Sequence, residues 1–520
     1  MRTLAIFAVL ALAACASTTP PKTVPTESLA ANAKADAKPA APPVDENDPR
    51  VVLKRHFEGE TPMMADLSEL CDGIGGRVTG SPAAARAVKW AAEKLRTIGV
   101  DEVRTESFRM PFLWLPDRAE ATATAPESFA IPTVASPGTA SMPAAVEAPL
   151  LDAGHGTAED FAKLGARAKG AFVLIHTDET KTFEELFAEY MRSPGIVAEA
   201  TKARVAGLVL QSTRPRGLLY EHPLSIGRTP LALTSVMIAR EHAERLGRLA
   251  GRSQVRLRVK VINRVGPSYE SQNVIGEVRG SEKPDEVVLL GAHLDSWGLG
   301  TGAEDNGINS ALVLDVARAF HQLGLKPRRT VRFALFMGEE QGMRGSTGYV
   351  ERHRAEMPNH TAALVFDIGS GHTTGFFLNG REELRGPVTK ALSIFPEIAA
   401  DAHPADALDG TDNWAFLLSG VPNLVAMQDP APYLPDYHAQ SDVVDRVNAK
   451  EAKRNAALAA ATIWWLANTN DTLPKQQNRA EVDALLVQTK LVDQMKAFDQ
   501  WHDWEQRIIG FPAGENRPSP

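Results

Sequence analysis

Six ionisable side chains in the second half of the chain are of the types that bind metal ions. They are two histidines and four carboxylates: His293, Asp305, Glu339, Glu340, Asp367 and His438. Several follow apolar runs that read as buried strands, in VVLLGAHLDSW, VRFALFMGEEQG and AALVFDIGSG. In open α/β sheets, ligands bind outside the carboxyl ends of the strands. Carboxylate oxygen and imidazole nitrogen without thiolate suit zinc or a similar divalent ion, so we predict a metal site at one sheet edge.

The first apolar run ends in His293 and, two residues later, Asp295. Because strand side chains alternate between faces, these two share a face. Asp295 can then hold the imidazole in the tautomer that binds a metal. A structural histidine is the alternative for any single residue of this kind, so the prediction depends on the neighbouring motifs.

Asp305 lies in the segment GLGTGAEDNGINSA, at the start of a predicted helix, where an Asp is equally suited to be a cap. Residues 298–303 also match a dinucleotide-binding fingerprint. The glycines lie well beyond the strand, however, with His293 and Asp295 between, which argues against nucleotide binding. A Gly-rich loop that carries a bridging carboxylate to two metals explains the same residues.

Glu339 and Glu340 are adjacent carboxylates, which repel each other unless a positive charge lies beside them. A metal ion supplies that charge. Because neighbouring residues point in different directions, one Glu can bind metal while the other serves as general base. A solvated acidic turn is the alternative.

Asp367 directly follows the run ALVF, and His438 lies in the turn-rich segment PAPYLPDYHAQSDVVD. Each is ambiguous alone, but the order His, Asp, Glu-Glu, Asp, His within one α/β unit favours a metal centre. The chain lacks the His-Glu-x-x-His, Gly-x-Ser-x-Gly and Gly-x-x-x-x-Gly-Lys motifs. Cys71 lies far from the cluster in sequence, and nothing indicates that it is a nucleophile.

The surrounding pattern predicts the elements that position these residues. Ser81 is a plausible N-cap for a helix that starts at Pro82 and ends near Gly99, and DEVRTESFRM reads as a strand. From SQNVIGEVRG to about residue 465, strands and helices alternate, which indicates a wound α/β sheet with helices on both faces.

Two stretches interrupt this alternation. The Pro/Ala-rich segment 116–148 reads as a boundary or a long connection. Residues 149–262 contain the short strand runs AFVLIHT, AGLVLQS and VRLRVKV between helical stretches, and no catalytic cluster. We predict that 149–262 is an inserted α/β domain that folds on its own.

Composition limits the possible roles. A chain of 520 residues with 44% hydrophobic content can bury a large core and form more than one domain. The net charge of −8, from 56 basic and 64 acidic residues, gives no reason to expect nucleic acid as a partner. The run AEVDALLVQTKLVDQMKAFDQWHDWEQRII predicts one C-terminal helix. Its Trp501 and Trp504 fit packing on the body better than a partner surface.

The first residues, MRTLAIFAVLALAAC, carry one positive charge and an apolar run too short to span a bilayer. They read as a secretory signal, and the Leu-Ala-Ala-Cys ending resembles the lipobox of bacterial lipoproteins. We therefore expect lipidation of Cys15, although an ordinary signal with an incidental Cys is the alternative. Residues 16–49 read as a disordered tether. Cys71 then has no disulfide partner, and the protein is expected in the bacterial cell envelope, facing the periplasm or on the outer membrane.

The motifs AHLDSW, GAEDNG, GEEQG, FDIGSG and YHAQSD, in this order and spacing, resemble those of the co-catalytic zinc exopeptidases. This family includes bacterial leucyl aminopeptidases and the carboxypeptidase Q type, and the likeness is closest to the latter. GGRVTGSPAAARAVKWAAEKLRTIG and GTDNWAFLLSGVPNL extend it, so that it covers most of residues 60–470.

The resemblance implies two zinc ions and a role for each of the six residues: one zinc on His293, Asp305 and Asp367, the other on Asp305, Glu340 and His438, and Glu339 as general base. It also implies a protease-associated type of insert in the zinc exopeptidase fold, peptide substrates with free termini, and a homodimer. The predicted division is a signal peptide 1–15, the tether 16–49, peptidase segments 50–148 and 263–475, the insert 149–262, and the C-terminal helix and tail 476–520.

Two further residues are candidates for the reaction. Tyr433 can donate a hydrogen bond to an oxyanion, or it is a packed aromatic residue of the loop. Asp412, in GTDNW, can contact a substrate amine or support the ligands, or it is a helix N-cap.

Two departures from the relatives put the substrate pocket in doubt: Asn306 where Asp is common, and Ile-Gly-Ser after Asp367. Two rival functions stay open. One is a receptor-like binding protein that has lost catalysis, and the other is a glutaminyl cyclase-like acyltransferase that uses one zinc.

Overall fold

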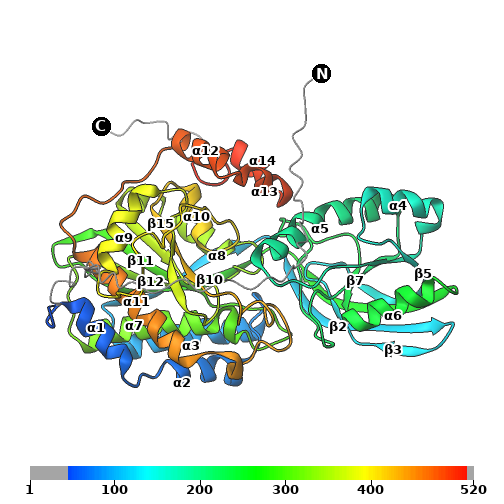
Figure 1. Ribbon diagram of the computed structural model, residues 1–520, viewed down its shortest axis with the longest axis horizontal. Helices are drawn as coiled ribbons and strands as arrows, with labels where there is room; N and C mark the ends of the chain where they lie inside the picture. Colours follow the sequence, from blue (N-terminus) through cyan, green and yellow to red (C-terminus); the bar gives the residue numbers. More distant parts are fainter. Residues whose placement is uncertain (1–44, 512–520) are drawn as a thin grey trace, which may run out of the picture. The chain divides into compact units, whose positions relative to one another are not determined.

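The computed structural model describes residues 45–511, and within them two separate sheets with their helices (Figure 1). The predicted signal, Cys15 and the tether up to residue 44 lie outside the described residues. Within the described part, no helix is long and apolar enough to cross a membrane.

The first sheet has seven strands and carries the motif residues. Its spatial order is β1 (Glu102–Met110), β10 (Tyr269–Val278), β12 (Arg329–Phe336), β11 (Lys283–His293), β13 (His360–Val365), β15 (Asn423–Gln428) and β14 (Thr373–Phe377). The four strands β12, β11, β13 and β15 are parallel to one another, and each outer strand pairs antiparallel with its inner neighbour. Parallel strands are covered on both faces, which explains why their sequences are continuous apolar runs.

Helices pack on both faces of this sheet. One face is covered by α1 (Pro49–Glu58), α2 (Met63–Ser68), α3 (Pro82–Ile98), α7 (Ile308–Gln322), α9 (Arg385–Ala391) and α11 (Ala449–Asn468). The other is covered by α8 (Arg344–Arg352) and α10 (Asn413–Leu418). Alternate residues of β11 face the two layers: Leu290 packs with the first set and Leu289 with the second. The predicted wound mixed sheet is confirmed.

The ends of α3 follow their sequence signals. Ser81 Oγ accepts a hydrogen bond from the Ala84 amide, Pro82 is the first helical residue, and Gly99 adopts a left-handed conformation with φ 87°. A serine cap, a proline at the first position and a glycine after the last turn satisfy or avoid unpaired backbone groups at each end.

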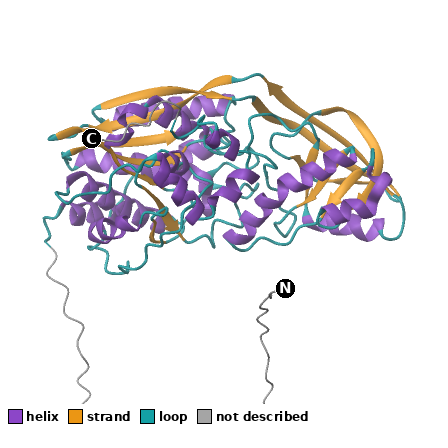
Figure 2. Ribbon diagram, turned by 90° about the horizontal axis from the view of Figure 1, so that it is seen from above, coloured by secondary structure: helices purple, strands orange, loops and turns teal. Residues whose placement is uncertain are grey.

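The inserted domain is built on the second sheet. Its eight strands, in spatial order, are β3 (Phe129–Ile131), β2 (Leu113–Ala125), β9 (Val255–Gly266), β5 (Met142–Asp152), β6 (Phe172–Ile175), β7 (Gly207–Gln211), β8 (Ser235–Ile238) and β4 (Thr133–Ala135). It also contains α4 (Ala158–Leu164), α5 (Phe183–Ala203) and α6 (Arg240–Ala250). Figure 1 labels most of these elements on its right side, and Figure 2 shows the same region, again on the right, with its strands in orange and its helices in purple.

The second sheet extends beyond the segment 149–262 predicted from the sequence. The Pro/Ala-rich segment 116–148, read as a connection, forms most of β2, all of β3 and β4, and part of β5. Strand β2 pairs antiparallel with β9 over almost its full length, with register shifts near Pro116 and Ala125. Prolines are tolerated at such irregular positions, and pairing with a distant strand overrides the weak local propensity of this stretch.

The C-terminal region forms three short helices instead of the predicted single helix: α12 (Arg479–Gln488), α13 (Leu491–Ala497) and α14 (Trp501–Glu505). The chain turns at Lys490 and Asp499, where φ is 61° and 58°. These turns let the short helices pack their apolar residues against α10, and Trp504 becomes fully buried in that cluster. Packing on the body thus explains Trp504, and Trp501 lies at the margin of the same cluster.

Candidate metal centre

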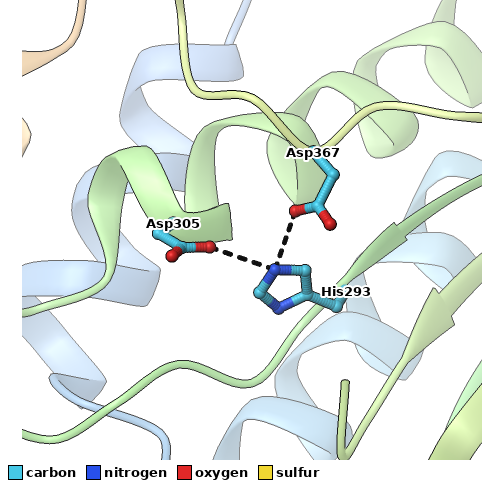
Figure 3. Close-up of side chains that lie close together, drawn as sticks. All are labelled: His293, Asp305 and Asp367. Carbon is cyan, nitrogen blue, oxygen red and sulfur yellow. Dashed lines mark hydrogen bonds and ion pairs between the residues drawn. The ribbon is translucent and has the colours of Figure 1, made fainter. Parts of the chain in front are cut away.

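The first group of candidate ligands lies at the carboxyl ends of neighbouring parallel strands. His293 is the last residue of β11, and Asp367 follows β13 by two residues. His293 Nε2 lies 2.9 Å from Asp367 Oδ1 and 3.1 Å from Asp305 Oδ1 (Figure 3). Three residues from separate elements of the chain thus converge on one point.

The second group shares Asp305 with the first. His438 Nε2 lies 2.8 Å from Glu340 Oε2 and 3.2 Å from Asp305 Oδ2. In each group, one donor atom per residue can be chosen so that all lie within 4.8 Å of one another. These groups coincide with the two ligand sets that the family resemblance implies, with Asp305 directing one oxygen to each histidine.

The chemistry of these donors fits cations. Asp305 Oδ2, Glu340 Oε1 and Asp367 Oδ1 are buried and accept no hydrogen bond, and the nearest groups to the two aspartate oxygens are the histidine nitrogens described above. A buried carboxylate oxygen without a partner is costly, and a metal ion between such oxygens removes that cost. Imidazole and carboxylate are also the ligand types that zinc takes in sites without cysteine.

Burial shapes the protonation of the acidic residues. It raises the pKa of Glu339 well above its usual value; the charge of His293 opposes this shift, while Asp367 adds to it. Burial also raises the pKa of Glu340 to about 7, against the opposing effect of His438. So many carboxylates in one buried place favour positive charge beside them.

The two histidines respond in the opposite sense. Burial alone would lower the pKa of His438, but Glu340 and Asp305 outweigh it and raise that pKa to about 10. For His293, burial is likewise outweighed, chiefly by Asp367, and its pKa is raised well above the usual value. Both rings lie in a strongly negative environment, which also attracts a metal ion.

Asp305 is not a helix cap. It has φ −121° and ψ 88°, and α7 begins three residues later, at Ile308. The carboxylate of Asp442 accepts hydrogen bonds from the amides of Ala303, Glu304 and Asp305, at 2.9, 2.6 and 3.2 Å. Asp442 therefore holds the loop that presents the shared carboxylate.

Arg77 also holds the Gly-rich loop. The buried guanidinium of Arg77 donates to the carbonyl oxygens of Leu294, Thr301 and Gly302, at 2.7, 2.6 and 2.8 Å. A planar group with five donors can join several carbonyls at once. Arg77 thus ties the end of β11 to the loop before Asp305.

Asp295 lies behind His293 but not in the way its spacing suggested. Strand β11 ends at His293, and His293 Nδ1 lies 3.1 Å from the main-chain oxygen of Asp295, against 3.7 Å from its carboxylate. That carboxylate accepts from Thr79 Oγ1 at 2.8 Å and from the Glu339 amide at 3.3 Å. Asp295 therefore joins His293 to the segment that carries the two glutamates.

Glu339 and Glu340 point to different places, as their adjacency suggested. Glu340 contacts His438, whereas Glu339 belongs to neither ligand group. Both side chains are largely buried in the turn after β12. Glu339 is thus free to act on a molecule bound beside the ligands.

Tyr433 is buried in the loop before His438. Its ring lies against Phe183 of α5, with 6.4 Å between ring centroids, and close to Gly369, which follows Asp367 by two residues. Burial raises the pKa of its hydroxyl well above the usual value, so the hydroxyl keeps its proton and can donate it in a hydrogen bond.

Asp412 occupies the N-cap position of α10, but its side chain makes no capping hydrogen bond. It is fully buried, and neither carboxylate oxygen has a hydrogen-bond partner. Burial raises its pKa to about 7, and His293 opposes that rise. A capping role therefore does not explain this residue.

Asn306, the residue after Asp305, uses both ends of its amide group. Its Nδ2 donates to the Phe366 main-chain oxygen at 2.9 Å, and its Oδ1 accepts from Asn309 Nδ2 at 2.7 Å. An ionised Asp could make only the second of these contacts.

His438 is supported from the inserted domain. Its Nδ1 lies 2.9 Å from the main-chain oxygen of Glu221, and its own main-chain oxygen accepts from the Glu221 amide at 2.9 Å. Sequence reasoning missed Glu221, Arg77 and Asp442. Arg77 and Asp442 lie inside recognisable motifs, GGRVTG and YHAQSD, whereas Glu221 has no local signal.

Cys71 is buried and free, with its sulfur 3.6 Å from the Gly302 main-chain oxygen. Burial raises the pKa of its thiol to about 11, so the reactive thiolate is scarce near neutrality. Cys71 packs behind the Gly-rich loop.

Two of the hollows among the described residues bear on where the reaction takes place. The small one is lined by Asp305, Glu340 and His438 among others, and so adjoins the second ligand group. The larger lies between α8, α10 and the C-terminal helices, and it contains none of the candidate ligands. We place the chemistry at the ligands because the two groups of candidate metal ligands meet there, at Asp305.

The chain is similar in sequence and fold to known peptidases. Residues 273–463 match the model of peptidase family M28. Carboxypeptidase Q of Bos taurus is 27% identical over 419 residues, which cover 79% of this chain and 86% of that protein. The structure of a peptidase M28 precursor from Shewanella amazonensis SB2B is similar with a TM-score of 0.74 and 25% identity, covering 82% of this chain and 98% of that one. BSAP, a zinc aminopeptidase from Bacillus subtilis, shares the fold with a TM-score of 0.62 at 21% identity, over 80% and 96% of the two chains.

Proposed function

We propose that this chain, which belongs to peptidase family M28 and is a metallo-exopeptidase, hydrolyses dipeptides or short peptides with the help of two zinc ions. The observation that carries the proposal is the position of Asp305, whose two oxygens face the two histidines His293 and His438. One carboxylate shared in this way suits a pair of ions that lie side by side.

His293, Asp305 and Asp367 would hold one zinc ion, and Asp305, Glu340 and His438 the other. When bound, the ions lower the pKa of a water molecule towards neutrality and polarise the peptide carbonyl. The buried oxygens of these residues that lack hydrogen bonds support this assignment.

Glu339 is the general base of the proposed reaction. It accepts a proton from the attacking water and later delivers a proton to the leaving amine. Its exclusion from both ligand groups leaves its carboxylate free for this task.

Two further residues complete the proposed site. Tyr433 donates its hydroxyl hydrogen bond to the developing oxyanion. Asp412, a buried carboxylate with two unpaired oxygens, is suited to a positively charged partner such as the free amine of a peptide.

The test is a chromatographic screen of dipeptides, and of longer peptides blocked at either end, with Glu339→Gln beside the wild-type protein. We expect hydrolysis by the wild type and a loss of about 10²- to 10⁴-fold in kcat for Glu339→Gln, with metal content unchanged. Glu382→Gln is the control, because Glu382 is an exposed carboxylate paired with Arg385.

The outcome separates this proposal from its rivals. Equal cleavage by Glu339→Gln and wild type would exclude Glu339 as the base. One zinc ion per chain, with cyclisation of N-terminal glutamine and no cleavage, would replace the peptidase by a glutaminyl cyclase-like acyltransferase. Peptide binding without any turnover would favour the receptor-like alternative.

Location and assembly are part of the proposal. The Leu-Ala-Ala-Cys ending supports lipidation at Cys15 and attachment to a bacterial envelope membrane. Cys15→Ser should release the protein from the membrane fraction without changing peptide hydrolysis. The homodimer expected from the resemblance is measured by light scattering after size-exclusion chromatography.

A further inference from the structure

We infer that residues 219–222 of the inserted domain are a functional part of the metal centre, and that Glu221 positions the ligand His438. The inference rests on the proposed function, because it concerns the ion that His438 would hold. It assigns the insert a direct role in metal binding.

The main chains of the two segments pair with each other. The Glu221 amide donates to the His438 oxygen at 2.9 Å, and the Gln440 amide donates to the Leu219 oxygen at 3.1 Å. Tyr220 and Ala439 form an antiparallel bridge between these bonds. A short piece of sheet therefore joins the insert to the loop that carries His438.

The same pairing sets the protonation of the ring. His438 Nδ1 faces the Glu221 main-chain oxygen at 2.9 Å, and a carbonyl oxygen can only accept a hydrogen bond. Nδ1 must then carry a proton, so that Nε2, which faces Glu340 and Asp305, is the nitrogen available to a metal ion. This is the tautomer that binds a metal through Nε2.

His438 needs such support because of its backbone. Its φ is 55°, in the left-handed region that residues other than glycine seldom occupy. A residue keeps such a conformation only where its surroundings enforce it. The paired segment of the insert provides that restraint.

The side chain of Glu221 connects this segment to the Gly-rich loop. Its Oε2 accepts from the amides of Gly298 and Leu299, at 2.9 and 3.0 Å, and the residue is 3% exposed. That loop leads to Asp305, the shared ligand. One residue of the insert therefore holds both His438, through its main chain, and the approach to Asp305, through side-chain hydrogen bonds to two loop amides.

Aromatic contacts restrain the ring plane. Tyr437 stacks on the His438 ring at 3.7 Å between centroids and an angle of 20°, and Trp297 meets it edge-on at 6.0 Å. The Tyr437 hydroxyl lies 2.8 Å from that of Tyr190, which belongs to α5 of the insert. The insert thus acts on the ring through the neighbouring aromatic residue as well.

The test is a zinc titration of metal-free protein by calorimetry, for the wild type, Glu221→Ala and Glu221→Gln. Alanine keeps the main-chain bonds to His438 and removes the side-chain bonds that fix Glu221 against Gly298 and Leu299. We therefore expect Glu221→Ala to loosen the segment that orients His438 and to weaken the His438-side ion about 10- to 100-fold. The other ion should stay within about threefold, because Arg77 and Asp442 still hold the loop at Asp305. His438→Ala identifies which of the two binding steps belongs to that side. Glu221→Gln should stay within about threefold of wild type, because one side-chain oxygen receives both amides and the amide oxygen can replace it.

Glu241→Ala is the matched control, because Glu241 is also a carboxylate of the insert that accepts from a backbone amide, that of Gly217. It should change neither binding step. Equal weakening of both ions by Glu221→Ala, or no change in either, would overturn the inference while wild type still binds two ions. A wild type that binds only one ion would instead overturn the proposed function.

Discussion

The two halves of the candidate metal centre are held in different ways. His293 ends a central strand of the sheet, and the main-chain oxygen that faces its Nδ1 belongs to Asp295, two residues along the chain. His438 lies on a loop, and the corresponding oxygen belongs to Glu221, 217 residues away in the loop between β7 and β8 of the inserted domain. One half is thus built from neighbouring sequence and the other from a contact between domains.

The difference follows from where each ligand sits. A strand paired on both sides orients its last residue without further help, since β11 is hydrogen-bonded to β12 and β13. A loop residue with φ 55° has no such frame and depends on whatever packs against it. The inserted domain is therefore expected to matter chiefly for the His438 half.

The largest effect is expected at the residue that the halves share. Asp305→Ala should weaken both ions by more than the roughly 100-fold that a supporting residue causes, and abolish hydrolysis. Asp367→Ala and Glu340→Ala should each weaken one ion only. Zinc titration of the three metal-free variants measures this, and loss of a single ion in Asp305→Ala would break the assignment of a shared ligand.

Tyr433→Phe tests whether the loop of the His438 half also contributes to the chemistry. Removing the hydroxyl should lower kcat about 10²- to 10³-fold, as for other oxyanion donors, with both ions retained. Steady-state kinetics on a cleaved dipeptide, with zinc content measured on the same sample, decides it. A decrease of less than about threefold would show that Tyr433 is only a packed aromatic residue.

Asp295→Asn is the counterpart of the Glu221 variants in the His293 half. The amide cannot accept from both Thr79 and the Glu339 amide, so the support behind His293 is weakened. The His293-side ion should weaken about 10- to 100-fold and the other hardly at all. If zinc titration shows equal weakening of both ions, the two halves are not independently supported.

The smallest expected effect is on the way the stability of the folded protein depends on pH, through a histidine of the inserted domain. Burial lowers the pKa of His222, which follows Glu221; among its charged neighbours, Glu189 opposes this shift, and His438, Arg214 and Arg192 add to it. The His222 ring therefore takes up a proton at a lower pH in the folded state than in the unfolded chain. The stability that the neutral His222 ring contributes is fully present above pH 6.5, the ordinary pKa of a histidine, and is lost as the pH falls below that value.

His222→Gln removes this titration. The decrease in Tm between about pH 7.5 and about pH 5.5 should be smaller in the variant than in the wild type. His155→Gln, at an exposed histidine of the same domain, is the control and should behave like the wild type. Identical pH profiles for His222→Gln and wild type would show that this part of the insert does not respond to acid.

Much of the first sheet could be predicted because its signals are local. The apolar runs of β11, β12 and β13 are each bounded by polar residues, and α3 has Ser81 and Gly99 at its ends. The second sheet was harder. Strand β2 is assigned by its pairing with β9, more than a hundred residues on, and no local pattern reveals such a pairing.

The C-terminal helices illustrate the same limit at shorter range. Their apolar spacing fits one continuous helix, but the cluster around Trp504 is formed only if the chain turns at Lys490 and Asp499. The gain from burying those side chains outweighs the continuous hydrogen bonding of a single helix.

The sequence by itself determined which side chains could bind metal and that several would gather at one sheet edge, because parallel strands place their carboxyl ends together. Only the tertiary structure decided how each is oriented. Asp305 faces both histidines because Asp442 and Arg77 hold its loop, and His438 meets the insert at Glu221. The physical reason is range: a strand is recognised from adjacent residues, whereas a hydrogen bond between distant segments exists only once the chain has brought them together.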